Sequence, residues 1–415
     1  MSIKVLWVSS FAPYDSVPHA GGQIHNYYLK ELIKNQEFDV SLVTFCKSEE
    51  ELKVREDLKK YNIKNTLIVF DHKLTFDNIL RRLYFIESRR NLFTRYAGIT
   101  NGYYYRRIKR ILDLEYSDYE PDIIILQWTQ VILFIDLIRK LFPNASIVVI
   151  EEDVSYLSYE RKASVEKKAY GKFKLNLLYR RLKLIELDAL KKSNLIILNN
   201  EKDRKLLLDE GIDKNKTWVW SPFFHNYSYV SRNKVKSKDI LFYGAMNRRE
   251  NYLSALWFIE NVMPKLQDEG FRFIVAGNKP HESLQSKNNK SIIVTGFVDD
   301  IGAYFSNSLC LVAPLVLGAG IKIKILEAMS SGIPVLTNSI GIEGIKAVNY
   351  QDYVFCESPE EYVSNIRRLS ENKNDRYLIN GKSFINENYN YASDANRFSL
   401  ILQDIYRSTV VNKRS

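Results

Sequence analysis

The chain has 415 residues, of which 46% are apolar and 13% aromatic, and this composition excludes an intrinsically disordered protein. Its length exceeds what one hydrophobic core usually supports, so we expect two domains. The formal net charge is +11, from 60 Lys and Arg against 49 Asp and Glu, and the basic residues are unevenly placed.

The first segments alternate between short apolar runs and a helical pattern. Lys4–Val8 and Phe38–Phe45 are predicted strands, and between them Gly21 and Gly22 precede a predicted helix. Strand, glycine turn, helix and strand begin a doubly wound parallel sheet, in which ligands bind beyond the carboxyl ends of the strands. Gly22 is therefore expected at a ligand edge, and the alternative is that the two glycines only turn the backbone.

Two basic regions, 75–112 and 161–183, interleave Arg and Lys with Tyr, Phe and Leu. The first has nine basic residues against Asp77 and Glu87. This pattern is typical of helices that lie on an anionic membrane surface. A solvated helix face is the alternative, and no recognised module accompanies the charge to favour nucleic-acid binding.

Polar residues follow two predicted buried strands, Asp122–Leu126 and Ser146–Ile150. The second strand leads into Glu151, Glu152 and Asp153, which we expect at the same sheet edge as the first glycines. One carboxylate there could position or deprotonate an acceptor hydroxyl. The alternative for Asp153 is an N-cap of the next helix.

The rest of the chain repeats the alternation of strands and helices. A predicted helix at Lys172–Lys191, a strand at Leu195–Leu198 and a helix at Glu201–Glu210 lead to turn formers and charged residues from Phe223 to Lys238, where we place the domain boundary. Further strands are predicted at Asp239–Tyr243, Phe271–Ala276, Ile292–Thr295, Leu309–Ala313, Val335–Thr337 and Tyr353–Phe355. Further helices are predicted at Tyr252–Gln267, Ile301–Asn307, Pro359–Glu371 and Tyr391–Arg407.

One stretch of the second half has the features of a ligand site. Gly318 and Gly320 precede a predicted helix, Lys322–Ser331, which Gly332 and Pro334 end. The first turn of this helix has two lysines and no acidic residue, although a helix N-terminus favours negative charge. We expect an anion such as phosphate there.

Glu327 lies on the same helix and could accept hydrogen bonds from sugar hydroxyls. A nucleotide diphosphate sugar satisfies both expectations.

These residues resemble a known family. The run GAGIKIKILEAMSSGIPVLTNSIGIEGI, at 318–345, is similar to the nucleotide-sugar-binding half of the retaining GT-B glycosyltransferases of family 4, and within it to the bacterial polysaccharide-assembly subgroup. The runs YGAMNRRENYLSALWFIENVMP, FIVAGNKP and VTGFVDDI carry the same resemblance. Residues 9–29 resemble the N-terminal loop of the family.

The resemblance implies an α/β protein of GT-B fold, with two Rossmann-like doubly wound domains facing across a cleft. Residues 1–222 would bind the acceptor, residues 223–390 the nucleotide sugar, and residues 391–415 would form a helix that packs back on the first domain. The implied reaction moves a hexose, with retention, from a nucleotide diphosphate sugar to a hydroxyl of a glycan, lipid-linked or protein-linked acceptor. The nucleotide sugar is a co-substrate, and no cofactor or metal is expected.

The resemblance also assigns roles to residues. Glu327 matches the ribose-binding glutamate that ends the family's Glu-x7-Glu motif, and the first glutamate of that motif falls on Ala319. Lys322 is assigned to the diphosphate, and Gly22 matches a glycine whose amide approaches the phosphates. The expected donor-binding residues are Gly22, Gly244, Asn247, Arg249, Phe297, Val298, Gly320, Ile321, Ile323 and Glu327.

The catalytic candidates include departures from the family pattern. Met246 and Asn247 occupy the region of the usual phosphate-binding arginine, and the arginines that follow are shifted. The usual histidine of the first domain falls on Glu152, which leaves Asp153 matched. The candidates are Asp153, Glu152, Lys322 and Arg248.

Two other functions stay open. The missing glutamate and histidine would suit an inactive homologue that acts as a partner or scaffold, and the carboxylates at 151–153 would suit a UDP-sugar 2-epimerase. The five histidines form no metal-ligand pattern.

The expected location is the cytoplasm, with peripheral association on the inner face of the membrane. The three cysteines form no disulfide framework, and the longest apolar run, Ile123 to Ile138, is too short and too polar to span a bilayer. The expected partners are a nucleotide sugar, a glycan or lipid-linked acceptor and an anionic membrane surface, without nucleic acid.

Overall fold

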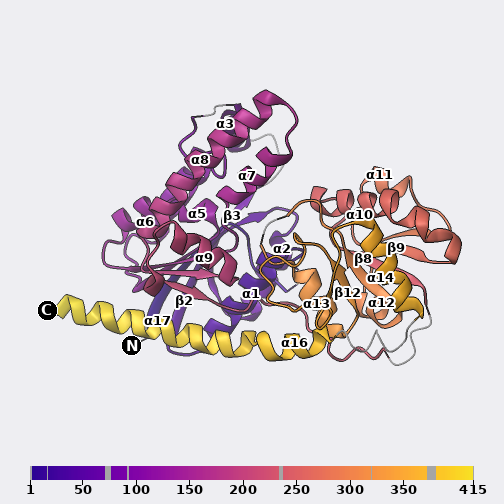
Figure 1. The fold of residues 1–415 in the computed structure, drawn as a ribbon. Helices are drawn as coiled ribbons and strands as arrows, with labels where there is room; N and C mark the ends of the chain where they lie inside the picture. The colour runs from indigo at the N-terminus through magenta and orange to yellow at the C-terminus, as the bar shows by residue number, and fades with distance from the viewer. Residues whose placement is uncertain are drawn as a thin grey trace. The chain divides into compact units, whose positions relative to one another are not determined.

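A computed structural model describes residues 2–15, 17–70, 76–90, 93–232, 237–318, 320–371 and 380–414. The chain divides into two compact units. The first unit is Met1–Phe223 together with Tyr391–Ser415, and the second is Phe224–Asn390. Each unit is built on one parallel sheet flanked by helices (Figure 1).

The sheet of the first unit has seven strands in the order β3-β2-β1-β4-β5-β6-β7. The order reverses direction between β1 and β4, which makes this point a topological switch where open α/β sheets bind ligands. The central strands are buried on both faces, as their continuous apolar runs predict. The strands are β1 (Ile3–Ser9), β2 (Phe38–Lys47), β3 (Lys64–Phe70), β4 (Ile123–Gln127), β5 (Ser146–Glu151), β6 (Leu195–Leu198) and β7 (Thr217–Val219).

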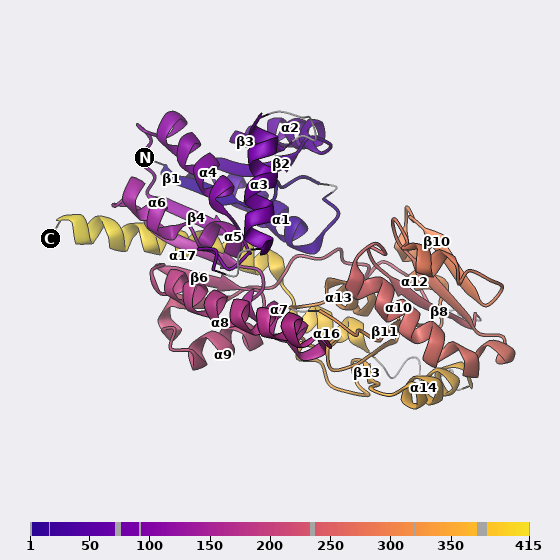
Figure 2. The same ribbon diagram turned by 90° about the horizontal axis from the view of Figure 1, so that it is seen from above.

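Helices connect these strands and cover the sheet (Figure 2). They are α1 (Ala20–Lys34), α2 (Glu51–Lys60), α3 (Phe76–Arg90), α4 (Gly102–Glu115), α5 (Thr129–Ile132), α6 (Ile135–Leu141), α7 (Tyr156–Val165), α8 (Ala169–Lys191), α9 (Glu201–Asp209) and α17 (Tyr391–Arg414). The interpretation of Gly21 and Gly22 as a turn before a helix is wrong. Both glycines lie in the first turn of α1, because His19 caps this helix one residue before it starts.

The second unit has a six-stranded parallel sheet in the order β10-β9-β8-β11-β12-β13. Its strands are β8 (Asp239–Tyr243), β9 (Arg272–Ala276), β10 (Ile292–Gly296), β11 (Cys310–Ala313), β12 (Val335–Thr337) and β13 (Val354–Phe355). Its helices are α10 (Arg249–Asn261), α11 (Glu282–Gln285), α12 (Ile301–Asn307), α13 (Ile323–Ser331), α14 (Pro359–Glu371) and α16 (Gly381–Asn388). Two doubly wound parallel sheets confirm the predicted α/β class.

The helix predicted at Tyr252–Gln267 is shorter than expected. α10 ends at Asn261, and two 3-10 turns, Met263–Lys265 and Gln267–Glu269, follow it. Pro264 in the first of these turns has no N–H to donate, so an α-helix cannot continue through it without losing a hydrogen bond. None of the described helices is long and apolar enough to cross a bilayer.

The C-terminal helix α17 belongs to the first unit, although it follows the whole second unit in sequence. Its Phe398 is 1% exposed and packs against the rings of Trp7, Trp220 and Tyr28 at centroid distances of 6.1, 5.4 and 6.3 Å. Asp394 accepts a hydrogen bond from the backbone N–H of Ser221 at 2.7 Å. The first unit thus completes its core with the last segment of the chain.

Truncation of this ring contact should destabilise the first unit. We expect Phe398→Ala to lower the free energy of unfolding by about 3–5 kcal/mol, because it empties a buried aromatic site. Leu400→Ala on the same helix is the matched control, since Leu400 is 58% exposed, and it should cost about 0.5 kcal/mol or less. Urea unfolding followed by tryptophan fluorescence measures both, and equal losses would contradict the packing role of α17.

Candidate functional site

The carboxyl ends of the strands in the second sheet are followed by glycines. Gly244 and Gly277 follow β8 and β9, and Gly296 ends β10. Their φ angles are 155°, 145° and 72°, which residues other than glycine rarely adopt. A Cβ on Gly277 would lie 1.7 Å from the carbonyl oxygen of Gly244. The backbones at this edge therefore approach one another without side chains between them.

Helix α13 begins behind a loop that contains Gly318 and Gly320. Gly320 has a φ of 65°, and Lys322, the N-cap residue, makes no side-chain capping bond. The first turn has no acidic residue, so its orphan N–H groups receive no side-chain acceptor from the helix itself. The helix ends at Gly332, whose left-handed φ of 78° confirms the predicted stop.

Lys324 is a lysine of α13 whose ammonium group is buried. Its Nζ donates to Asn251 Oδ1 at 2.7 Å and lies 4.7 Å from the centre of the Phe242 ring. Burial of the ammonium group lowers the pKa of Lys324 to about 7, against the opposing effect of Glu250. Across the described ranges, no carboxylate lies within ion-pair distance of Lys324, so its direct contacts are an amide oxygen and a ring face, while Glu250 and Glu327 act on it from farther away.

Lys324 and the first glycine of the sheet edge adjoin each other. A Cβ on Gly244 would lie 3.0 Å from Lys324 Nζ and 2.9 Å from Asn251 Nδ2. The carboxyl end of β8, the start of α13 and the side chain of α10 thus meet at one polar point. Lys324 is one of the two first-turn lysines at which an anion was expected, although it was not among the predicted donor-binding residues, and Asn251 was not predicted at all.

Lys322 is held differently from Lys324. Its Nζ lies 3.8 Å from Glu343 Oε2 and donates to the carbonyl oxygen of Gly320, and its side chain is 10% exposed. The first turn of α13 has no acidic residue, as predicted, and Lys322 meets a carboxylate from outside the helix. Glu343 comes from the loop after β12, and no local pattern in the sequence signals that contact.

Glu327 lies one turn further along α13 and is 8% exposed. Tyr243, the last residue of β8, donates its hydroxyl to Glu327 Oε2 at 2.5 Å, and the backbone N–H of His225 lies 3.4 Å from Oε1. Burial raises the pKa of Glu327 to about 7, although the Tyr243 hydrogen bond opposes this. The carboxyl group is thus fixed in place beside Lys324, and sequence reasoning missed Tyr243 as its partner.

The shifted arginines lie at the start of α10. Arg248 is its N-cap residue, is 58% exposed at its side chain, and pairs with Glu250 at 2.6 Å. Asn247 and Arg249 are exposed, whereas Met246 is fully buried. A solvated ion pair of this kind holds an arginine only weakly, so Arg248 can exchange partners.

The remaining donor-binding candidates occupy two loops. Phe297 is 69% exposed directly after Gly296, and Val298 is half-buried. Ile321 is half-buried before α13 and Ile323 is buried as its first residue. Ala319 lies outside the described residues.

In the first unit, the amide of Gly22 already has an acceptor. Its N–H donates to His19 Nδ1 at 2.9 Å, as the N-cap bond of α1. A Cβ at this position would lie 2.5 Å from Val17 Cγ2 and 2.7 Å from His19 Cε1. Gly22 is therefore required by packing around its own cap.

Glu152 is the centre of a buried network at the end of β5. It accepts from Gln127 Nε2 at 2.6 Å and from Asn199 Nδ2 at 2.8 Å, so each carboxylate oxygen has a partner. These amides in turn accept from Trp7 Nε1 at 3.0 Å and Trp220 Nε1 at 2.7 Å. Burial raises the pKa of Glu152 to about 7.

The neighbouring carboxylates differ from Glu152. Glu151 is buried, bonds to Thr129, and has a pKa well above its ordinary value because of burial and the nearby Glu186. Asp153 is exposed. The interpretation of Asp153 as a helix cap is wrong, because Glu186 takes that role by accepting from the backbone N–H of Ser155 at 2.7 Å and of the next residue at 3.1 Å.

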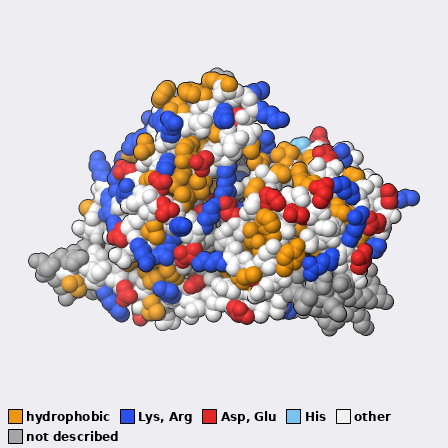
Figure 3. Space-filling model, in the orientation of Figure 1, with side chains coloured by type: hydrophobic (Ala, Val, Ile, Leu, Met, Phe, Trp, Pro, Cys, Tyr) orange, Lys and Arg blue, Asp and Glu red, His pale blue; other side chains and the backbone are white. Residues whose placement is uncertain are grey.

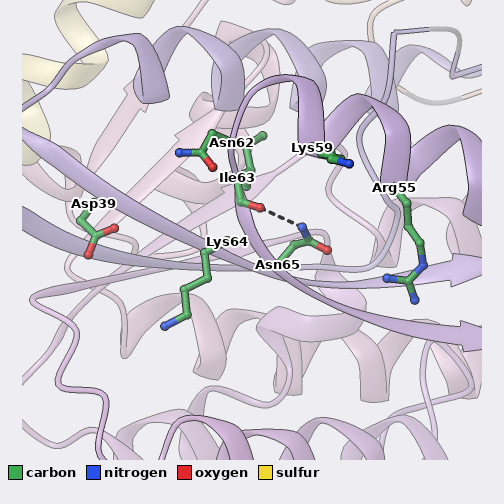
Figure 4. A pocket seen from close by; sticks show the side chains of 7 residues that line it. All are labelled: Asp39, Arg55, Lys59, Asn62, Ile63, Lys64 and Asn65. Carbon is green, nitrogen blue, oxygen red and sulfur yellow. Dashed lines mark hydrogen bonds between the residues drawn. The ribbon is translucent and has the colours of Figure 1, made fainter.

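A surface pocket of about 510 Å³ lies elsewhere in the first unit. It is lined by Asp39, Arg55, Lys59, Asn62, Ile63, Lys64 and Asn65 (Figure 4). Lys64 and Asn65 begin β3, so the pocket lies at the amino end of a parallel strand, opposite to the edge where such sheets bind ligands. Its basic side chains do not point toward one another in Figure 4, and we do not place the functional site there.

The chain is similar to known proteins in part of its sequence and in its fold. Residues 237–372 match a family model described as "Glycosyl transferases group 1". An uncharacterized 44.6 kDa protein in the cps region of Klebsiella pneumoniae is 25% identical over 210 residues, which are 46% of this chain and 54% of that protein. The chain spans about half the length of the curated relatives it matches.

Solved structures match nearly the whole chain. HepE of Anabaena, crystallised with UDP, has a TM-score of 0.63 at 11% identity, over 97% of this chain and 100% of that one. Sucrose-phosphate synthase of Thermosynechococcus elongatus has a TM-score of 0.67 at 12% identity, over 98% and 100%. A putative UDP-N-acetylglucosamine 2-epimerase of Listeria monocytogenes has 0.56 at 14%, over 98% of each chain. These likenesses, with the two Rossmann-like units, show the GT-B fold.

The raised pKa of Glu327 predicts a pH dependence of stability. Because the folded chain keeps this proton up to about pH 7 while the unfolded chain releases it near 4.5, stability is lost as the pH rises through this window. Glu327→Gln removes the titrating carboxyl group. The free energy of unfolding of the wild type should therefore fall by up to about 3 kcal/mol relative to that of the variant between about pH 4 and pH 8.

Urea unfolding of both proteins across this pH range measures the difference. Glu282→Gln, at an exposed glutamate of α11, is the control and should show a nearly constant difference from the wild type. A Glu327→Gln difference that does not change with pH would contradict the buried, protonatable carboxyl group.

Proposed function

We propose that this chain is a glycosyltransferase that takes a nucleotide diphosphate sugar in its second unit. It transfers a hexose, with retention, to a hydroxyl of a glycan, lipid-linked or protein-linked acceptor. The observation that carries the proposal is Lys324, an ammonium group buried beside Gly244 with no carboxylate within ion-pair distance in the described chain.

A diphosphate would satisfy this lysine. An ammonium group removed from water is unfavourable unless an opposite charge replaces the solvent. The N-terminus of α13, which has no side-chain cap and follows Gly320, is the usual environment of a bound phosphate. Lys322 adds a second cation near the loop, and its ion pair with Glu343 is long, at 3.8 Å.

Glu327 suits the ribose of the nucleotide. Tyr243 holds its carboxyl group in one orientation, and it lies one turn from Lys324 on the same helix. A carboxylate has about four acceptor sites on its two oxygens, so Glu327 could accept from sugar hydroxyls in addition to Tyr243 and the His225 N–H. The exposed ring of Phe297, after Gly296, is available to contact the base.

In the reaction that we propose, the acceptor hydroxyl attacks the anomeric carbon from the face that the diphosphate leaves. The bond from that carbon to the phosphate oxygen breaks, and the departing diphosphate takes the hydroxyl proton. Lys324, Lys322, Arg248 and the α13 N-terminus would stabilise the negative charge that grows on the diphosphate. Preorganised charge stabilisation of this type is usually the largest catalytic contribution.

The first unit would hold the acceptor. Glu152 is bonded at both oxygens to core amides, so we assign it to positioning the end of β5 rather than to proton transfer. Asp153, which is exposed next to it, is the carboxylate that could orient an acceptor hydroxyl. The relatives from the cps region of Klebsiella pneumoniae support polysaccharide assembly as the setting.

Two other functions have specific support. The likeness to a putative UDP-N-acetylglucosamine 2-epimerase shares the fold, and the carboxyl groups at 151–153 would suit acid and base chemistry. The departures from the family pattern at 152 and 319 would suit an inactive homologue. A diphosphate ligand would explain the buried Lys324 in a glycosyltransferase and in an epimerase. An inactive homologue that binds no nucleotide would leave the buried Lys324 unexplained.

Removal of the Lys324 charge should weaken donor binding without unfolding the protein. We expect Lys324→Met to weaken UDP and UDP-sugar or GDP-sugar binding by about 2–5 kcal/mol, more than tenfold in Kd, because the diphosphate loses a buried partner. Lys290→Met, at an exposed lysine of the same unit, is the matched control and should bind as the wild type does. Thermal shift against a panel of nucleotide sugars, followed by calorimetry, measures these affinities.

The same panel separates the three functions. Transfer to an added acceptor supports the glycosyltransferase, and interconversion of the sugars without an acceptor would identify an epimerase. A wild-type protein that binds no nucleotide would indicate a scaffold. Equal losses of affinity in Lys324→Met and Lys290→Met would overturn the role of Lys324.

A further inference from the structure

Helix α3 turns its aliphatic side chains toward solvent. Ile79, Leu83 and Ile86 lie at helical spacing on one face and are 44%, 58% and 46% exposed, with Arg82 exposed among them. A helix on a globular protein normally buries such a stripe. We call these three residues the α3 stripe.

The other face of α3 is the one that packs on the protein. Tyr84 fits against Gly102, where a Cβ would lie 2.9 Å from its ring. Asp77 accepts from the Tyr103 hydroxyl at 2.5 Å, and the Arg81 guanidinium lies 5.0 Å from the centre of the Phe70 ring. Polar and aromatic contacts therefore fix α3 in an orientation that leaves the stripe uncovered.

A second group of exposed apolar side chains lies where α7 turns into α8. Val165, Tyr170 and Phe173 are 59%, 70% and 62% exposed. The same segment has one acidic residue, Glu166, and four exposed lysines: Lys162, Lys167, Lys168 and Lys172. We call this segment, 162–173, the hairpin tip.

The α3 stripe and the hairpin tip belong to one part of the first unit. Arg181 of α8 donates to the backbone oxygens of Phe93 and Thr94, just after α3, at 3.1 and 3.0 Å. Tyr159 of α7 donates to Ala97 O at 2.9 Å. Figure 1 draws α3, α7 and α8 at one edge of the unit, and Figure 3 shows hydrophobic atoms there with Lys and Arg atoms around them.

We propose that the α3 stripe and the hairpin tip dock the first unit on an anionic lipid bilayer. Aliphatic and aromatic side chains next to lysines fit the boundary between acyl chains and negatively charged head groups. A nucleic acid would use the lysines but would gain little from Ile79, Leu83 and Ile86, so the stripe favours lipid. Binding combines attraction to the head groups, which salt weakens, with burial of apolar area, which salt does not weaken.

Sedimentation of the full chain with vesicles tests this surface. Vesicles of phosphatidylcholine mixed with phosphatidylserine should bind the protein, and phosphatidylcholine vesicles should bind it much less. The double variant Lys167→Glu/Lys168→Glu should reduce binding by about tenfold or more, because each lysine near the surface contributes to the attraction. Leu83→Ser should reduce the binding that remains at high salt by about fivefold.

Matched variants on α2 control for total charge and apolar area. Lys53→Glu/Lys59→Glu makes the same change in charge at exposed lysines of the same unit, and Leu52→Ser removes a leucine that is 75% exposed. Both should leave vesicle binding unchanged, and thermal unfolding should be the same for all variants. Equal losses at the two lysine pairs, retention of Lys167→Glu/Lys168→Glu on the vesicles, or absence of wild-type binding would each overturn the proposal. Nucleotide binding is measured separately, so failure here leaves the proposed transferase activity intact.

Discussion

The burial of the Lys324 ammonium group is the constraint on which the site of the second unit depends. It sits between an amide oxygen of Asn251 and the ring of Phe242, and its neighbour Gly244 leaves no room for a side chain. Burial brings the pKa of Lys324 and of Glu327 to about 7 from opposite directions. Both groups are thus poised between charge states, and a diphosphate and a ribose would fix the charged forms.

The buried carboxyl groups of the first unit accept hydrogen bonds from groups of the protein itself. Glu152 is surrounded by donors from its own core, and the amides of Gln127 and Asn199 are themselves fixed by indole N–H groups. A carboxylate held by two core amides in this way fixes the ends of the strands that carry them. Glu186, which caps α7, is a second buried carboxylate used for structure.

The sequence predicted the alternation of strands and helices, because buried parallel strands and glycine stops leave strong local patterns. The strands of both sheets and the bounds of α13 follow that pattern within a few residues. Contacts between distant segments left no such pattern: Glu343 near Lys322, Tyr243 on Glu327, and Glu186 in place of Asp153 as a cap. The composition of residues 75–112 indicated helices of the membrane-surface type, but only the contacts of α3 with α4 show that its apolar face points outward.

Proton uptake on nucleotide binding tests the central claim most directly. At about pH 8 free Lys324 is largely neutral, and a diphosphate beside it should raise its pKa and recharge it. Calorimetry of UDP binding in buffers of different ionisation enthalpy should therefore detect uptake of close to one proton by the wild type, and almost none by Lys324→Met. Tight UDP binding without proton uptake, or with equal uptake by both proteins, would contradict the account.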